Sequence, residues 1–448
     1  ACRRCRPDTV PGTRGWDLGS DLAADAVTLI GDGVVDEVGV AGLARRLHVS
    51  ERHLHRTLVA CVGVGPLDLA VSRRAQTARM LLDQTTLPLA DIAFAAGFAS
   101  VRQFNDVMRR EFAVAPSVLR RTPADGPKAG APEISLRLRT RRPLATAALG
   151  DFLRLRTAVG LERHAPGAQW RHERLVDLPH GAVHVVVEAG SDMRGAPESD
   201  HVVLRCSTVP LADLAALVSR VRRWLDLDAV PAVVDDALGA DPALAAVVAR
   251  CPGLRVPTTP DVWETCLRAV LGQQVTLAGG LTLLTRLVES FGSAGRASIA
   301  GLTLVPPAHV LAEVDPRQIA TIGIPLGRAR ALQGLSAAVA SGAIDMGGDR
   351  DRALAQVVDI AGIGPWTRDY LALRAFGDPD AFPATDVGIR RGASALGLPE
   401  DARALTAHAQ RWRPWRAYAA QHLWNVPIDR PARPTAGGSR TDPMKETA

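Results

Sequence analysis

The sequence predicts a mainly helical protein of several domains, with one small antiparallel sheet. Three observations support this fold class. The chain has 448 residues, whereas single domains usually hold about 100–200. Apolar residues recur at helical spacing along most of the chain, with capping residues between the segments. Only within residues 132–208 do apolar and polar residues alternate, as they do in strands with one buried face.

The composition is that of a globular protein with a modest excess of positive charge. The formal net charge is +6 and the isoelectric point about 9.4, which suits a polyanionic partner such as nucleic acid. No apolar run reaches about 18 residues, so no membrane span is predicted. No charged-then-apolar leader opens the sequence, and we therefore expect a cytoplasmic protein.

The six cysteines fall into two groups. Four are scattered and are expected to be buried as small hydrophobic side chains: Cys61, Cys206, Cys251 and Cys266. Cys2 and Cys5 form the motif CRRC, which is half of a typical four-cysteine Zn²⁺ site. We expect residues 1–15 to be the remnant of a zinc-binding module that holds Zn²⁺ through these thiolates. Two unpaired surface thiols would explain the spacing equally well.

Residues 20–123 are predicted to be helical throughout. In VAGLARRLHVSERHLHRTLVACVG, a short amphipathic helix is followed by a turn and by a helix that Ser50 caps. The pattern recurs in LPLADIAFAAGFASVRQFNDVMRREF, where Gly97 ends the first helix and Ser100 caps the next. With a long helix around Leu67–Leu82 between them, these segments predict two tandem helix-turn-helix units.

The start of each second helix carries polar and basic side chains that suit phosphate and base-edge contacts in a DNA major groove. These side chains are Arg52, His53, Arg56, Arg102, Gln103 and Asn105. A single capped helix pair is common in any small helical bundle, but two pairs of matching design favour DNA binding.

The same region resembles the DNA-binding domain of AraC-type transcription regulators. The shared residues are Gly65-Pro66, Arg74, Ala93, Gly97-Phe98, Phe104, Phe112 and Pro116-Ser117. With CRRCRPD upstream, the front of the sequence resembles the regulatory half of the Ada methylation-response family. The resemblance implies promoter DNA as a partner, together with RNA polymerase.

The sequence pattern changes after the helix-turn-helix region. Residues 124–131 have the composition of a linker. The alternating segments ISLRLRT, VHVVVEA and HVVLRCS predict a small α+β domain at 132–208, with a helix near Pro143–Arg154. Residues 211–428 are again mostly helical. The tail at 429–448 lacks the apolar residues for a core and is expected to be disordered.

The segment AGIGPW predicts a glycine hairpin between two helices, at Asp351–Asp359 and Trp366–Phe376. Gly362 and Gly364 allow backbone with positive φ. Unpaired N–H groups at the start of the second helix could bind a DNA phosphate, and carbonyls of the turn could hold a monovalent cation. Taken alone, this motif is weak, because any tight connection between helices uses glycine.

Aromatic residues gather around this hairpin. Trp366 and Tyr370 lie four residues apart and therefore share a helix face. Four of the eight tryptophans and both tyrosines fall within Trp366–Trp424, which indicates aromatic recognition as well as packing. For Trp412, Trp415 and Tyr418 we favour packing.

Three segments, GIGPWTRDYLALRAFGDPDAFPATD, LRAVLGQQVT and RWRPWRAYAAQHLW, resemble helix-hairpin-helix DNA glycosylases of the AlkA type. The resemblance covers about residues 132–428, so the whole chain resembles an Ada–AlkA fusion. It implies an enzyme that excises alkylated purines, chiefly 3-methyladenine, from double-stranded DNA. It also implies base flipping, since the target must leave the stack.

The resemblance also assigns roles to particular residues. Asp386 takes the position of the catalytic acid, and the aromatic base pocket falls on Trp366, Tyr370 and Trp424. DNA contacts fall on Gly362, Gly364, Thr367, Gln273 and Gln274. Gln274 stands at the wedge position, where the family has Leu; it can fill the gap left by a flipped base and hydrogen-bond the orphan partner. The carbonyls of Val358, Ile360 and Ile363 take the positions that hold Na⁺ or K⁺.

Asp386 also has a structural interpretation. An Asp before VGIRRGASALG is a natural N-cap, and the two roles are compatible. Asp378 and Asp380 are rival acids, which we rank lower because a polar loop tip would leave them screened by water. An ionised Asp386 would stabilise an oxocarbenium-like sugar as the base leaves.

No Lys stands between residues 129 and 444. A glycosylase that also cuts the strand needs a Lys at the position of Trp366, so a monofunctional enzyme is expected. Two alternatives stay open from sequence. One is a transcription regulator whose glycosylase-like half only binds DNA; the other is a helical small-molecule binder, which would explain the aromatics but not the hairpin.

Overall fold

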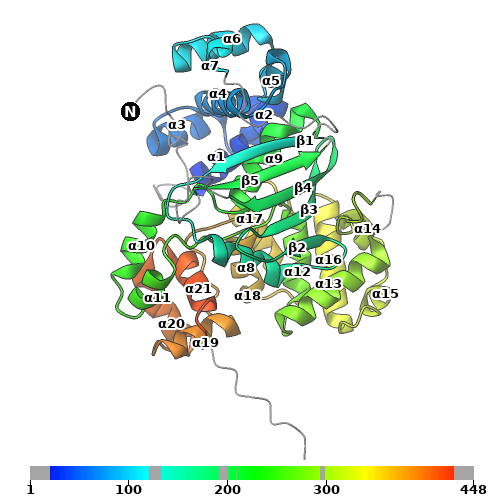
Figure 1. The fold of residues 1–448 in the computed structure, drawn as a ribbon. Coiled ribbons are helices and arrows are strands. Elements are labelled where there is room, and N and C mark those ends of the chain that lie inside the picture. Colours follow the sequence, from blue (N-terminus) through cyan, green and yellow to red (C-terminus); the bar gives the residue numbers. More distant parts are fainter. Residues whose placement is uncertain (1–20, 121–132, 191–199, 208, 293–297, 428–448) are drawn as a thin grey trace, which may run out of the picture.

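The computed structural model describes residues 21–120, 133–190, 200–207, 209–292 and 298–427 (Figure 1). Cys2 and Cys5, the expected linker at 124–131 and the tail at 429–448 lie outside these residues. Within the described ranges, no single helix has the length and hydropathy needed to cross a membrane. The bent pair Glu51–Val62 and Pro66–Gln84 passes that test jointly, by length and composition only.

The first described segment is entirely helical and occupies the top of Figure 1. Its helices are α1 (Asp21–Gly31), α2 (Val34–Arg46), α3 (Glu51–Val62), α4 (Pro66–Gln84), α5 (Leu89–Ala95), α6 (Val101–Phe112) and α7 (Pro116–Leu119). Ser50 caps α3 by accepting the N–H of His53 at 3.2 Å, and Ser100 caps α6 by accepting that of Gln103 at 3.1 Å. The tandem helix-turn-helix units and α4 between them are therefore confirmed.

The sheet that follows is antiparallel, with the order β1-β5-β4-β3-β2. Its strands are β1 (Glu133–Arg139), β2 (Glu162–Ala165), β3 (Arg171–Leu178), β4 (Gly181–Ala189) and β5 (His201–Ser207), and α8 spans Thr146–Arg156. The alternating patterns correctly predicted β1, β4 and β5, but β2 and β3 were missed. In β3, the polar residues His172 and Arg174 occupy buried positions. Apolar and polar residues therefore do not alternate along this strand.

The rest of the chain is helical; its first helix packs against the sheet, and the other helices form a helical array around the largest hydrophobic core. Its helices are α9 (Leu211–Trp224), α10 (Pro231–Gly239), α11 (Ala245–Arg250), α12 (Val262–Leu271), α13 (Leu277–Phe291), α14 (Ala308–Ala312), α15 (Pro316–Ala320), α16 (Leu326–Ala340), α17 (Arg350–Val358), α18 (Pro365–Arg374), α19 (Val387–Ala395), α20 (Ala402–His408) and α21 (Arg416–Trp424). The two helices predicted around the hairpin correspond to α17 and α18, with ends shifted by one or two residues.

A buried cluster of four charges ties the sheet to the helical array. Glu162 of β2 accepts hydrogen bonds from Arg174 at 2.8 Å and Arg268 at 2.9 Å. Both arginines also bind Glu264 of α12. Burial alone would raise the pKa of Glu162, but Arg268 and Arg174 hold it below its ordinary value. Because every charge has a partner, loss of any one would leave an uncompensated buried ion.

The helix-turn-helix half packs directly against the sheet. One continuous hydrophobic cluster holds Leu81 of α4 and Phe104 of α6 together with Leu138 of β1 and Leu217 of α9. Helix α5 lies against α9, and α4 lies against β1. The two halves therefore share a core, even though the expected linker separates them in sequence.

Candidate active site

Asp386 lies between two indole rings. Its Oδ2 accepts a hydrogen bond from Nε1 of Trp366 at 2.9 Å, and its Oδ1 accepts one from Nε1 of Trp424 at 2.8 Å. Trp366 stacks on Tyr370, with ring centroids 5.1 Å apart and planes 22° apart. All four side chains are half-buried, so the group keeps one side open to solvent. The structure thus brings together the acid and the three rings that the sequence singled out.

Helix geometry explains why Trp366 and Tyr370 lie together. Residues 366 and 370 are one turn apart on α18, so their rings share a face. Trp424 comes from α21, which packs closely on α19. A Cβ at Gly392 would lie 2.0 Å from the Leu423 carbonyl oxygen, and one at Gly388 would lie 2.8 Å from the Trp424 ring. A larger residue at Gly392 would push α21 away, and one at Gly388 would displace the Trp424 ring beside Asp386.

Asp386 is also the N-cap of α19, because its Oδ1 accepts the Ile389 N–H at 3.1 Å. Three N–H donors thus converge on one carboxylate, an acceptor that can take about four hydrogen bonds when ionised. The capping and pocket interpretations of Asp386 coexist, as the sequence allowed.

The reason given for ranking Asp378 and Asp380 lower was wrong. Asp380 is buried and accepts two hydrogen bonds from the Arg416 guanidinium, at 2.7 and 2.8 Å. Asp378 lies 3.6 Å from the guanidinium of buried Arg350. Both acids thus have arginine partners, and Asp380 is buried whereas Asp378 is half-buried.

The hairpin between α17 and α18 is closed by a hydrogen bond from the Ile363 N–H to the Ile360 carbonyl, at 3.0 Å. Gly362 has φ +92, but Gly364 has φ −109. Both glycines allow positive φ, and only Gly362 adopts it. Gly364 is the N-cap of α18; Pro365, the first residue of the helix, has no N–H, and the Thr367 and Arg368 N–H groups donate to the Gly364 carbonyl at 3.0 and 3.3 Å.

A second loop, between α12 and α13, is hydrogen-bonded to this hairpin. Nε2 of Gln273 donates to the Gly362 carbonyl at 3.2 Å and to Oγ1 of Thr367 at 3.1 Å. Gln274, next in the chain, is exposed and has φ +55, a conformation rare outside glycine. The hairpin and the Gln274 tip therefore lie on the same side of the molecule.

Two arginines behind the pocket escaped sequence analysis. The Arg374 guanidinium lies 4.8 Å from the centroid of the Trp424 ring and 4.6 Å from that of Phe152, and the Arg156 guanidinium lies 3.9 Å from Phe152. Burial, and then the neighbouring Arg156, lower the pKa of Arg374 to about 9. Arg374 follows Tyr370 by four residues on the same face of α18, a spacing that could have revealed it.

The proposed major-groove residues lie on α3 and α6. Arg52, His53, Arg56 and Arg102 are exposed. Gln103 and Asn105 are half-buried and hydrogen-bonded locally: Gln103 accepts the N–H of Ala99 in the turn before α6 at 3.1 Å, and Asn105 donates to the Val101 carbonyl of its own helix at 2.9 Å. The exposed side chains of the proposed major-groove surface are therefore mostly arginines.

The described residues contain no group of three or more His, Cys, Asp or Glu side chains arranged to hold a metal ion. The expected Zn²⁺ ligands Cys2 and Cys5 lie outside those residues. The expected Na⁺ or K⁺ ligands are carbonyls: Val358 ends α17, Ile360 and Ile363 belong to the hairpin turn, and all three are oxygen donors suited to a hard cation.

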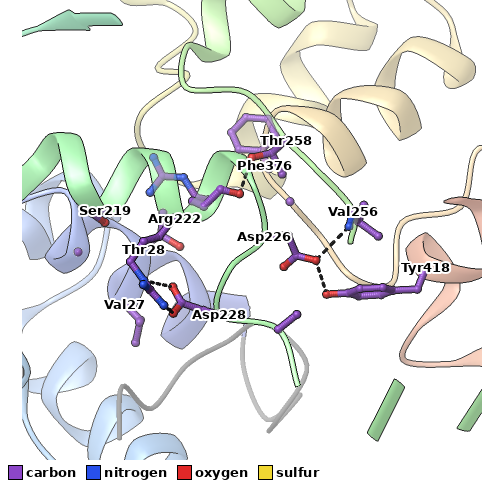
Figure 2. A pocket seen from close by; sticks show the side chains of 14 residues that line it. Val27, Thr28, Ser219, Arg222, Asp226, Asp228, Val256, Thr258, Phe376 and Tyr418 are labelled. Carbon is purple, nitrogen blue, oxygen red and sulfur yellow. Dashed lines mark hydrogen bonds and ion pairs between the residues drawn. The ribbon is translucent and has the colours of Figure 1, made fainter. Parts of the chain in front are cut away.

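Trp412, Trp415 and Tyr418 are core residues, as favoured from sequence. Tyr418 borders a cavity of about 170 Å³ between α1, the end of α9 and the helical array (Figure 2). Its hydroxyl donates to Asp226 at 2.8 Å, and the Val256 N–H donates to the same carboxylate at 3.0 Å. Burial raises the pKa of Asp226 to about 6.

Three protein-family models match successive parts of the chain. A helix-turn-helix domain matches residues 43–122, an AlkA N-terminal domain matches 135–261, and an HhH-GPD superfamily base excision DNA repair protein matches 267–417.

Several known proteins are similar to the chain. A protein of Mycobacterium tuberculosis (strain H37Rv), described as a probable bifunctional transcriptional activator/DNA repair enzyme AlkA, is 45% identical over 95% of this chain and 84% of its own length. DNA-3-methyladenine glycosylase 2 of Escherichia coli (strain K12) is 33% identical over 55% of this chain and 83% of its own. The solved structure of the 3-methyladenine DNA-glycosylase of Archaeoglobus fulgidus matches with a TM-score of 0.55 and 18% sequence identity. The match covers 64% of this chain and 96% of that protein, and it supports the fold alone.

Proposed function

The chain belongs to the family of the bifunctional transcriptional activator and DNA repair enzyme AlkA, and on this basis we propose that it excises alkylated purines, chiefly 3-methyladenine, from DNA. The observation that supports this most is the carboxylate of Asp386, held between Trp366 and Trp424 beside the DNA-facing hairpin. The helix-turn-helix half would bind promoter DNA and regulate the response to alkylation.

Asp386 would act by electrostatics. Cleavage of the N-glycosidic bond leaves positive charge on C1′ of the sugar, and a fixed carboxylate beside it lowers the energy of that state. Two indole N–H groups and the Ile389 N–H restrain the carboxylate, so little reorganisation is needed as charge develops. With Oδ1 already accepting two of these bonds, Oδ2 has the greater free capacity to face the sugar.

The rings would select the damaged base. Alkylation gives a purine a positive charge, and a cation over an aromatic face gains about 0.5–2 kcal/mol. Trp366 and Tyr370 stack on each other, and Arg374 covers one face of Trp424, so the base would meet the outer faces of these rings. This preference is modest, but alkylation also weakens the N-glycosidic bond, so the chemistry itself adds to selectivity.

We expect hydrolysis without strand cleavage. Trp366 stands where a strand-cleaving relative would need an amine, and no Lys occurs between residues 129 and 444. Water would therefore be the nucleophile, with Asp386 orienting it. Borohydride should trap no covalent protein–DNA adduct during turnover.

The deciding experiment compares the protein with its Asp386→Asn variant on methylated DNA. We expect the protein to release 3-methyladenine and the variant to lose nearly all release, because the amide is neutral. Binding of a duplex with an uncleavable abasic-site analogue should persist in both. Equal release would exclude Asp386 from the mechanism, and binding without any release would favour a regulator whose glycosylase-like half only binds DNA.

Three further parts of the proposal concern ligands and partners. Zn²⁺ at Cys2 and Cys5 would need further ligands to complete a tetrahedral site. Na⁺ or K⁺ at the carbonyls of Val358, Ile360 and Ile363 would place positive charge where the hairpin meets a DNA phosphate. Contact with RNA polymerase would follow from the regulatory role.

A further inference from the structure

The helix-turn-helix half is docked on the glycosylase half through charged contacts as well as through the shared core. Asp32, next to α1, accepts hydrogen bonds from both terminal nitrogens of Arg223 on α9, at 2.8 and 3.0 Å. A Cβ at Gly31 would lie 2.9 Å from Oγ of Ser219, so α1 and α9 are in close contact. The cavity of Figure 2 lies along this seam, where Val27 and Thr28 of α1 line the same space as Phe376.

One contact across the seam reaches the elements that carry the chemistry. Asp25 of α1 is 6% exposed, and its Oδ2 accepts the backbone N–H of Arg350 at 3.2 Å. Arg350 is the first residue of α17, where backbone N–H groups have no partner within the helix. Asp349, the N-cap, accepts the Arg352 N–H instead. Asp25 thus supplies a carboxylate to the positive end of α17 from the other half of the protein.

Arg350 connects this contact to two parts of the active site. Its guanidinium, in a side chain 5% exposed, lies 3.6 Å from Asp378 in the loop that joins α18 to Asp386. The helix that it starts is nine residues long, about 13 Å at 1.5 Å per residue, and ends at the hairpin of Gly362. The position of Arg350 therefore affects both the hairpin and the loop before the carboxylate.

We propose that Arg350, held by Asp25 of the helix-turn-helix half, is a positioning residue for base excision. Docking of α1 fixes the start of α17 and the Asp378 loop, and these fix the hairpin and Asp386 relative to each other. The helix-turn-helix half is then part of the working glycosylase as well as a regulator. This inference rests on the proposed excision activity.

The test compares Asp25→Asn with Asp32→Asn in the full chain. Both substitutions remove one acidic partner from the same seam, but only Asp25 contacts Arg350. We expect Asp25→Asn to lower the single-turnover rate of 3-methyladenine release about 10-fold, because small misplacements of reacting groups are costly. The rate of the Asp32→Asn variant should stay within about twofold of that of the unmodified protein. Affinity for an undamaged duplex, which the helix-turn-helix half would bind, should change in neither.

Asp378→Asn provides a second route, because it removes a partner of Arg350 on the active-site side of the seam. It should reproduce the rate loss, and it decides the question if Asp25→Asn does not fold. Equal rates in Asp25→Asn and Asp32→Asn, or a normal rate in Asp378→Asn, would overturn the inference. If the unmodified protein releases no base, the proposed function itself fails, so the two failures are distinguishable.

Discussion

At the scale of single residues, the pocket depends on what surrounds Asp386. Both indole N–H groups and a backbone N–H point at its carboxylate, while Arg374 lies behind the Trp424 ring. The rings hold the acid, and in the proposed function they also face the base. The family resemblance assigned Trp366, Tyr370 and Trp424 to the base pocket. Local spacing could not predict the hydrogen bonds to the acid, because Trp366 and Trp424 lie on helices that meet only in the fold.

The Trp424→Phe variant separates these two tasks. It keeps a ring but removes the N–H that donates to Asp386. A hydrogen bond to a charged group contributes about 1.5–3 kcal/mol, so the excision rate should fall at least about 10-fold. Single-turnover release of 3-methyladenine measures this. Trp412→Phe is the control: its N–H donates to Asp241 in the core, so it should affect stability and leave the rate nearly unchanged.

At the scale of elements, two connections between helices set the geometry of the side proposed to face DNA. The hairpin between α17 and α18 and the loop between α12 and α13 are joined by Gln273. The hairpin was predictable because its signal, Gly-x-Gly between two amphipathic helices, lies within a few residues. The hydrogen bond between this hairpin and a loop about 90 residues earlier could not be predicted. A local sequence pattern holds no information about such a long-range contact.

Gly362→Ala tests the hairpin. Gly362 has φ +92, and a Cβ there would lie 3.1 Å from Cβ of Ala331. We expect stability to fall by about 1–2 kcal/mol, the cost of left-handed backbone for an L-residue. Binding of a duplex with an abasic-site analogue should weaken at the same time. Gly327→Ala is the control, since its Cβ would meet nothing within 4 Å; equal affinity in the two variants would contradict the role of the hairpin.

The connection between α9 and α10 makes stability depend on pH. Asp226 has its pKa raised from 3.8 to about 6 by burial. The folded state therefore binds an extra proton between these values, and stability is lost as pH rises through 6. Asp226→Asn should abolish that loss. The melting temperature of the variant relative to the unmodified protein should rise from pH 4 to 6 and level off above; a difference independent of pH would contradict the raised pKa.

At the scale of the whole molecule, the two surfaces proposed to bind DNA lie far apart. Helix α6 lies at the top of Figure 1, and α19, which Asp386 caps, lies near the bottom. The halves are nevertheless packed together through α5, α9 and the Asp25–Arg350 contact. A variant on the outer surface of α6 should therefore affect DNA binding by the helix-turn-helix half, whereas a variant at the Asp25–Arg350 contact should affect base excision.

Arg102→Ala tests that separation. Arg102 is exposed on α6 and lies outside the seam. We expect weaker binding of undamaged duplex at low salt, since a phosphate or base contact is lost, with base release nearly unchanged. Fluorescence anisotropy and the release assay measure the two effects. A parallel fall in release would mean that this surface, and not only the seam, serves excision.

The sequence by itself determined what depends on neighbours within a few residues. Capping by Ser50 and Ser100, the shared face of Trp366 and Tyr370, and the N-cap at Asp386 all follow from helical periodicity and local hydrogen bonding. Only the tertiary structure shows that the Trp424 N–H donates to Asp386, that arginines bind Asp378 and Asp380, and that α1 docks beside α17. Those contacts join segments distant in sequence, and close packing at glycines such as Gly388 and Gly392 selects them. A one-dimensional pattern does not encode which surfaces fit together.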